Sequence, residues 1–205
     1  MLNELVNRSR GLPASAKVLI LGGGYSGRML AALLRRLGNT VLCTRRDQSR
    51  PDADLLFDSD RDLLPQPDAL QGITHLLSTI PPSPEGQDPA LHCLRSQLES
   101  MPLQWVGYLS TTGVYGDTQG NWVRETDPAR PGQARSRRRL DCEEAWQDSG
   151  LPIQILRLPG IYGPGRSVLN TVQEGRARRI DKTGQVFCRV HVEDIAGACL
   201  HLMHR

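Results

Sequence analysis

The chain of 205 residues has few aromatic residues, a small net charge and no long apolar run, and each shortage excludes a class of protein. Aromatic residues make up 4% of the chain, and the formal net charge at pH 7 is +3. A protein whose main function is to bind nucleic acid usually has a larger excess of basic over acidic residues, with aromatic residues between them. No segment approaches the roughly 20 apolar residues that span a bilayer. We therefore expect neither a nucleic acid nor a membrane as partner.

Paired cysteines are also missing. The five cysteines are odd in number and form no CxxC pair, so neither a disulfide framework nor a zinc site is expected. The histidines lack metal-ligand spacing too, and no metal site is predicted. The first 16 residues contain no apolar run typical of a signal peptide. These absences predict a cytoplasmic protein with reduced thiols.

What the chain does contain is a regular alternation of short apolar runs and helical patterns. The runs predict strands over residues 17–21, 40–44, 54–58, 74–79, 105–110 and 152–157. Leucines at helical spacing follow the first strand up to Gly38, and further helices are predicted over residues 89–100 and 137–149. This order predicts an α/β fold, a doubly wound parallel sheet with helices on both faces. The length allows one domain over residues 17–205, preceded by an N-terminal extension of residues 1–16.

The sequence Gly22–Gly23–Gly24–Tyr25–Ser26–Gly27 matches GxGxxG between the first predicted strand and its helix. In this pattern Gly22 permits a tight turn, Gly24 lets a pyrophosphate approach the backbone, and Gly27 lets helix and strand pack closely. The amides of Tyr25 and Ser26 would face the phosphates at the start of the helix. A Rossmann-type dinucleotide site is predicted here, and a glycine turn that only links strand to helix is the alternative.

Arg45 and Arg46 follow the second predicted strand, where an NAD-binding loop carries Asp or Glu. A carboxylate there would repel a 2′-phosphate, whereas a guanidinium can bind it through two hydrogen bonds. The pair therefore favours NADP over NAD as cofactor. Two alternatives stay open: Asp47 could still serve NAD, and the arginines could be a solvated loop pair.

Four motifs in order resemble the extended short-chain dehydrogenase/reductase family, the NAD-dependent epimerase/dehydratases of nucleotide sugars. They are the glycine loop, Ser110–Thr111–Thr112–Gly113–Val114–Tyr115–Gly116–Asp117, Arg157 with Ile161–Tyr162–Gly163–Pro164–Gly165, and His191–Val192–Glu193–Asp194–Ile195–Ala196. The chain is most similar to an atypical branch of nucleoside-diphosphate-sugar epimerase relatives that lacks the YxxxK motif. Relatives continue well beyond the His191 motif, so the resemblance implies a substrate lobe that is shortened, truncated or absent.

The resemblance assigns cofactor contacts to residues that follow the third and fourth predicted strands. Asp58 matches an aspartate that contacts adenine in the family, although an exposed loop acid beside Asp60 is the alternative. Ser78, Thr79 and Ile80 fall where the family lines the adenosine and ribose.

The resemblance also places Thr111 on the position of the catalytic Ser or Thr. Its hydroxyl could donate to a carbonyl or alcohol oxygen of the substrate. Thr112 is the local alternative, and a strand-end threonine that bonds its own backbone is a common structural one. Tyr115 is not the catalytic tyrosine of the family, and we expect it to pack. We expect His191 to position the chain.

The family's catalytic Tyr and Lys are replaced. An ungapped match puts Arg135 at the Tyr and Arg139 at the Lys. Arg139 could still reach a ribose hydroxyl, but Arg135 cannot replace a phenol, because a guanidinium keeps its proton and accepts no hydrogen bond. The alternative is a solvated helix start with ion pairs from Arg137 to Asp141 and from Arg139 to Glu143. Basic residues at a helix N-terminus oppose its dipole, which suggests an anionic partner.

These residues predict an NADP-dependent, epimerase/dehydratase-like oxidoreductase that acts on a nucleotide sugar or a similar phosphorylated metabolite. The alternative is a catalytically silent dinucleotide-binding sensor or scaffold. Thr111 and the Tyr162–Gly165 motif favour the enzyme, while the missing tyrosine favours the sensor. Gly160 stands where the family has an Asn that contacts substrate, so the substrate stays open, as does a homodimer.

Overall fold

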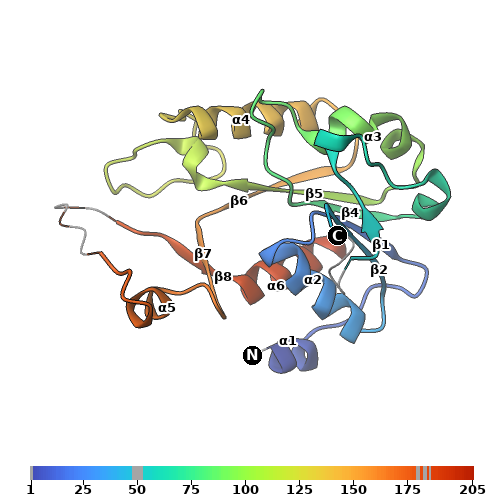
Figure 1. The fold of residues 1–205 in the computed structure, drawn as a ribbon, viewed down its shortest axis with the longest axis horizontal. Helices are drawn as coiled ribbons and strands as arrows, with labels where there is room; N and C mark the ends of the chain where they lie inside the picture. Colours follow the sequence, from blue (N-terminus) through green and yellow to red (C-terminus); the bar gives the residue numbers. More distant parts are fainter. Residues whose placement is uncertain (1, 48–52, 179–180, 182–183, 185) are drawn as a thin grey trace.

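The computed structural model describes residues 2–47, 53–178, 181, 184 and 186–205, and a parallel sheet forms its centre (Figure 1). Within these residues the main sheet has six strands in the order β3-β2-β1-β4-β5-β6. Every pair in it is parallel. The predicted Rossmann-type, doubly wound sheet is thereby confirmed. The strands are β1 (Lys17–Leu21), β2 (Thr40–Arg45), β3 (Leu55–Leu56), β4 (His75–Ser78), β5 (Trp105–Thr111) and β6 (Ile153–Leu158).

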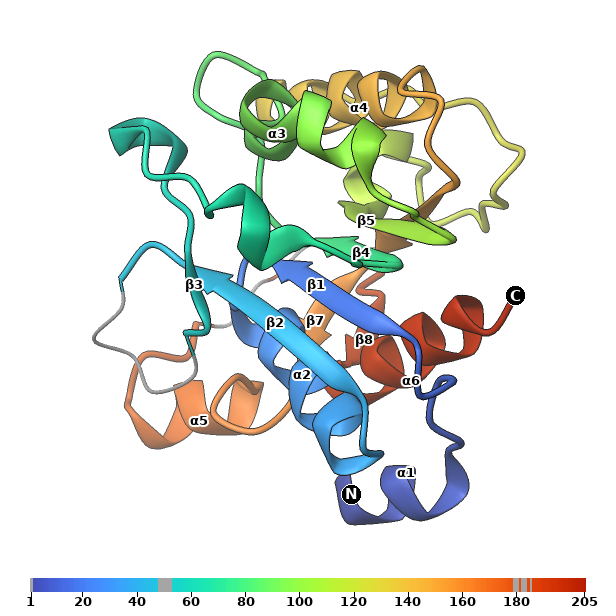
Figure 2. The same cartoon turned by 90° about the vertical axis from the view of Figure 1, so that its right-hand side faces the viewer.

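Helices cover both faces of this sheet (Figure 2). One face carries α2 (Tyr25–Arg36) and α6 (Val192–Met203), and the other carries α3 (Pro89–Ser100) and α4 (Ala134–Gln147). Side chains of β1 alternate between the two layers: Val18 and Ile20 join the core under α2 and α6, while Leu19 and Leu21 join the core under α3 and α4. The chain order reverses between β1 and β4, the place where open α/β sheets bind ligands.

Local signals explain the helix boundaries that the sequence predicted well. The bounds expected for α3 are those observed, because Pro89 begins the helix and the Asp88 carboxylate accepts hydrogen bonds from the next two free amides. Gly38 has a φ of +84° after the end of α2, a conformation that favours glycine. α4 begins at Ala134, earlier than expected, and β3 is shorter than expected. None of the described helices is long and apolar enough to cross a membrane.

A small second sheet lies beyond the end of β6. β7 (Gly160–Tyr162) pairs in parallel with β8 (Arg189–His191), and α5 (Val168–Gln173) lies on the connection between them (Figure 1). None of these elements was predicted from the sequence, and neither were α6 and α1 (Leu2–Arg8). Strands of three residues are too short to show a period of two, and their pairing joins segments distant in the chain.

The segment before β1 packs onto the core of the sheet. Leu12 is buried in the cluster under α2 and α6, and Leu2, Leu5 and Val6 of α1 pack against the same cluster. The side chain of Leu5 also lies close to Gly197 on α6.

Candidate functional site

The glycine loop joins β1 to α2 in a conformation that two of its glycines make possible. Gly22 has a φ of +92°, and a Cβ there would lie 2.6 Å from the hydroxyl oxygen of Thr79. A Cβ on Gly27 would clash with the carbonyl oxygen of Gly22. The Thr79 hydroxyl donates to that same carbonyl at 2.6 Å, and the Gly22 amide donates to the Thr44 hydroxyl at 3.0 Å. The fold itself therefore requires Gly22 and Gly27.

Gly24 is different, because nothing in the fold requires a glycine there. Its φ is −70°, and a Cβ built on it would meet no atom within 4 Å. It occupies the N-cap of α2, where no side chain caps the free amides. A helix N-terminus with open space before it is suited to an anionic group that approaches the backbone. The loop geometry thus fits the diphosphate of a dinucleotide.

A cavity of about 360 Å³ opens beside the loop. Six of the residues predicted to bind the cofactor line it: Gly22, Gly24, Arg45, Arg46, Thr79 and Ile80. The other predicted site residues do not line it: Tyr25, Ser26, Gly27, Asp58, Ser78, Thr111 and Arg139. The lining residues are Gly22, Gly23, Gly24, Thr44, Arg45, Arg46, Asp47, Phe57, Ser59, Thr79, Ile80 and Pro81.

The two arginines at the end of β2, Arg45 within the strand and Arg46 directly after it, have different surroundings. The side chain of Arg45 lies against the glycine loop, since a Cβ on Gly23 would come 2.8 Å from the Arg45 Nε. Arg46 points into solvent and forms an ion pair with Asp60 at 3.6 Å. Arg45 is therefore the better placed of the two to hold a group beside the loop.

Asp58 and Ser78 are both buried, and neither side chain lines the cavity. The Asp58 carboxylate accepts from the amide of Asp60 at 3.1 Å, which caps the short helix η1 (Ser59–Arg61). Ser78 ends β4, and its hydroxyl has no hydrogen-bond partner within the described chain. The neighbours of Asp58, Phe57 and Ser59, line the cavity in its place.

Thr111 lies at the end of β5, where the motif predicts the catalytic hydroxyl. Its oxygen accepts from the amide of Gly113 at 3.1 Å, which caps the short helix η3 (Thr112–Tyr115). The structural alternative raised from the sequence is thus observed. The hydroxyl hydrogen remains available to donate, because the amide uses only the oxygen's accepting capacity.

Arg139 departs from the ion pairs expected along α4. Its Nη1 donates to the Ile80 carbonyl, the Tyr108 hydroxyl and the Leu109 carbonyl at 3.3, 3.0 and 3.1 Å. The guanidinium therefore lies at the carboxyl ends of β4 and β5. The pair from Arg139 to Glu143, part of the alternative interpretation, does not form, because Glu143 binds Arg157 of β6 at 2.7 Å instead.

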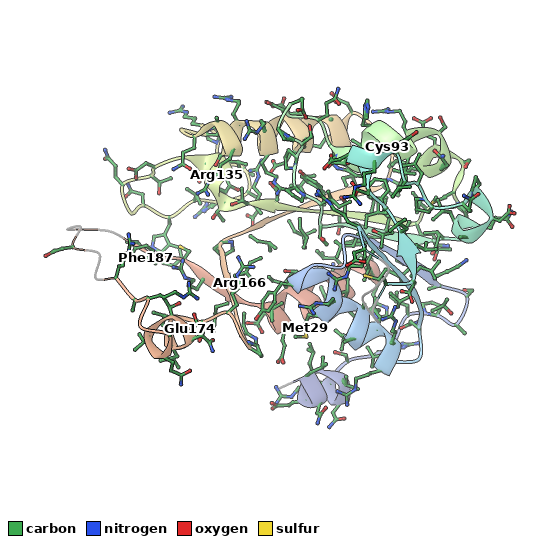
Figure 3. All side chains as sticks on the ribbon, in the orientation of Figure 1. Met29, Cys93, Arg135, Arg166, Glu174 and Phe187 are labelled. Atoms are coloured by element: carbon green, nitrogen blue, oxygen red, sulfur yellow. The ribbon has the colours of Figure 1, made fainter. Side chains whose placement is uncertain are left out.

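The pair expected from Arg137 to Asp141 does not form within the described chain either. Arg135, in the place of the family's tyrosine, is exposed at the first turn of α4 (Figure 3). Tyr115 packs as expected: it is buried, and its ring lies 4.8 Å from the guanidinium of Arg157.

The Tyr162–Gly165 motif meets the glycine loop directly, a contact that the sequence analysis did not foresee. The Tyr25 hydroxyl donates to the Pro164 carbonyl at 3.0 Å. The ring of Tyr162 packs edge-on against His191 at 5.1 Å, and His191 in turn accepts from the amide of Glu193 and caps α6. His191 thus positions the chain.

Comparisons with known proteins show which proteins the chain is similar to. A scan against profiles of known protein families finds no match. Protein YeeZ of Escherichia coli K12 is 32% identical over 91% of this chain and 73% of its own length. A functionally unknown conserved protein from Silicibacter pomeroyi is 40% identical, with a TM-score of 0.82 over 93% of this chain and 68% of that one.

Two further structures share the fold. A putative NAD-dependent epimerase/dehydratase from Methylobacillus flagellatus is 28% identical, with a TM-score of 0.69 over 92% of this chain and 70% of that one. MoeE5 in complex with UDP-glucose and NAD is 21% identical, with a TM-score of 0.71 over 90% of this chain and 70% of its own. Its structural neighbours include a protein described as a putative NAD-dependent epimerase/dehydratase. The chain belongs to the same family as Escherichia coli YeeZ.

Proposed function

We propose that the chain binds NADP at the glycine loop and is an epimerase/dehydratase-like oxidoreductase for a nucleotide sugar or a similar phosphorylated metabolite. The observation that carries the proposal is the open space at Gly24, at the uncapped start of α2. The structure of MoeE5 with NAD and UDP-glucose supports both ligand classes for a protein of this fold. Residues 17–205 would act as the dinucleotide-binding domain.

The fit of NADP follows from the residues around the cavity. Amides of Tyr25 and Ser26 would meet the diphosphate, and Arg45 would hold the 2′-phosphate, assisted by Arg46. Ser78, Thr79, Ile80 and Asp58 would lie toward the adenosine and its ribose, as the resemblance implies. NAD remains the alternative cofactor, with Asp47 at the ribose.

The reaction would depend on what the chain itself can do beside the nicotinamide. When bound, the cofactor supplies hydride transfer. The Thr111 hydroxyl would donate a hydrogen bond to the substrate oxygen. Arg139 would donate to a ribose hydroxyl through the guanidinium nitrogens other than Nη1, which binds the strand ends. Arg135 would place a permanent positive charge where the family has a phenol, so it cannot take a proton.

Two tyrosines could supply the missing proton acceptor, and their surroundings differ. Tyr115 is buried beneath Arg157, whereas Tyr162 is 43% exposed and contacts His191. Tyr162 is the better candidate, because a proton must leave the group for solvent or substrate. If neither serves, the protein is a dinucleotide-binding sensor, which the replacement of the family tyrosine by Arg135 favours.

The test combines binding with hydride transfer. Calorimetry with NADP and NAD asks whether the site binds a dinucleotide. Stopped-flow absorbance at the reduced-nicotinamide band, across a panel of nucleotide sugars, asks whether hydride moves. Turnover that is lost in Thr111→Ala supports the enzyme, and a matched Thr112→Ala variant controls for the neighbouring hydroxyl. Binding without turnover, with activity gained only in Arg135→Tyr combined with Arg139→Lys, supports the sensor. A protein that binds neither dinucleotide contradicts both.

A further inference from the structure

We propose that Arg166 binds the diphosphate of the dinucleotide, on the side opposite the amides of α2. The proposal rests on the proposed function, since it adds a residue to the same cofactor site. The diphosphate would then be held by two segments, the glycine loop and the turn that follows β7.

The backbone of Arg166 is fixed by a tight turn over Gly163–Pro164–Gly165–Arg166. The Gly163 amide donates to the Arg166 carbonyl at 3.1 Å, and the Arg166 amide donates to the Gly163 carbonyl at 2.9 Å. Proline in the second position and a φ of +70° at Gly165 are typical of a type II turn. The side chain of Arg166 therefore starts from a defined position.

This turn is held against the first residue of α2. The Tyr25 hydroxyl donates to the Pro164 carbonyl at 3.0 Å, and a Cβ on Gly163 would lie 2.6 Å from that hydroxyl. The guanidinium carbon of Arg166 lies 5.5 Å from the centre of the Tyr25 ring. Figure 3 shows the Arg166 side chain beside the start of α2. A cation is thus held next to the N-terminus of the helix.

The positive charges of the Arg166 guanidinium and of the α2 N-terminus have no anionic partner among the described residues. Arg166 is exposed and forms no ion pair with a carboxylate of the described residues, and the first turn of α2 contains no acidic residue. The partial positive charge of a helix N-terminus and a nearby guanidinium repel each other unless an anion lies between them. Gly24, the N-cap of the same helix, has open space at the position that a Cβ would take. A diphosphate would accept from the amides on one side and from the guanidinium on the other.

A nucleotide sugar also carries a diphosphate, which Arg166 could bind in the same way. The dinucleotide is favoured because the residue that positions Arg166 is Tyr25, which belongs to the glycine loop itself. The experiment must therefore include both ligands.

The experiment measures ligand affinity in Arg166→Gln, with Arg10→Gln as a matched control on an exposed arginine in the segment before β1. The ligands are NADP, NAD, UDP-glucose and adenosine 2′-monophosphate, which carries the 2′-phosphate but no diphosphate. We expect Arg166→Gln to weaken NADP and NAD by the same factor, about tenfold. Binding of adenosine 2′-monophosphate should not change. Arg166→Lys keeps the positive charge but not the planar guanidinium with its two parallel donors, so it should lose less affinity for NADP and NAD than Arg166→Gln.

Other outcomes would overturn the proposal. Unchanged affinity for NADP and NAD would show that Arg166 does not contact the diphosphate. Loss of UDP-glucose binding alone would assign the arginine to the substrate. An equal loss for adenosine 2′-monophosphate would show a general disturbance of the site, which the melting temperatures of both variants would also reveal. If the wild-type protein binds no dinucleotide, the proposed function fails and this inference fails with it.

Discussion

The Nη2 atom of Arg157 lies 2.7 Å from a carboxylate oxygen of Glu143, and this ion pair ties β6 to α4. The Nε of Arg157 also donates to both oxygens of Glu143, at 3.2 and 3.1 Å. The Glu143 side chain is only 1% exposed, and the hydrogen bonds that its carboxylate accepts from Arg157 raise the pKa of that arginine. Since Arg157 also stacks on Tyr115, the pair fixes the segment that follows Thr111.

Removal of Glu143 should therefore destabilise the fold strongly. Glu143→Leu leaves the Arg157 charge without its partner at a largely buried position, and we expect the free energy of unfolding to fall by about 3 kcal/mol. Urea denaturation measures this change. The double variant Glu143→Leu with Arg157→Met is the control and should regain much of the loss. An unchanged urea midpoint in the single variant would show that the pair contributes nothing.

The glycine loop allows a matched pair of substitutions. Gly24→Val should abolish dinucleotide binding while the melting temperature hardly changes, because its side chain would enter open space that the diphosphate needs. Gly27→Ala should lower the stability by about 1–3 kcal/mol, because its methyl group would clash with the Gly22 carbonyl. Calorimetry and thermal unfolding of both variants check the two expectations. Normal binding by Gly24→Val would mean that the glycines serve only the turn.

Arg45 should decide between the two cofactors. We expect Arg45→Gln to weaken NADP binding by about tenfold and to leave NAD binding unchanged, because the lost hydrogen bonds go to the 2′-phosphate. Arg46→Gln should have a smaller effect, since Arg46 is exposed and already pairs with Asp60. Isothermal titration of both variants with both cofactors provides the comparison. Equal affinity of the wild-type protein for NAD and NADP would contradict the assignment.

The buried carboxyl group of Asp88 should make the stability depend on pH. Burial raises its pKa from the ordinary value of 3.8, although its oxygen accepts from the amides of Ala90 and Leu91 at 3.0 and 3.1 Å. With the folded pKa above the unfolded one, the contribution of Asp88 to stability is complete below pH 3.8 and is lost as the pH rises through the raised value.

Asp88→Asn keeps an accepting oxygen at the cap of α3 and removes the titration. We expect the variant to gain stability relative to the wild type as the pH rises from below 3.8 to neutral, measured by urea unfolding at both ends of that range. Asp88→Ala, which removes the cap as well, should be about 1 kcal/mol less stable than Asp88→Asn at both ends of the range. A difference between Asp88→Asn and the wild type that does not vary with pH would refute the expectation.

Local features were predictable from the sequence, and long-range partners were not. β1, the glycine loop and α3 are marked by an apolar run, by glycines and by a proline at the first helical position, all within a few residues. Glu143 was paired with Arg139, its neighbour on the helix, but it binds Arg157 on another element. The partner of Arg139 at Ile80 lies 59 residues away, so no helical spacing could have revealed it.

In the candidate site too, local features could be predicted from the sequence and long-range contacts could not. Gly22, Gly24 and Gly27 could be placed from their spacing, and the position of Thr111 at a strand end followed from the motif. The contact of Tyr25 with the turn after β7 joins residues 139 apart and needs the whole sheet to form first.

The layer beneath α2 has a consequence for how the chain folds while it is being synthesised. Ile20, Leu30 and Leu34 share a core with Ile195, Cys199 and Leu200 of α6, whereas the opposite layer is complete once α4 and β6 have formed. During translation one face of the sheet can close early, and the other is covered only by α2 until α6 leaves the ribosome. Nascent chains would therefore present the uncovered part of that face to chaperones until α6 has been synthesised.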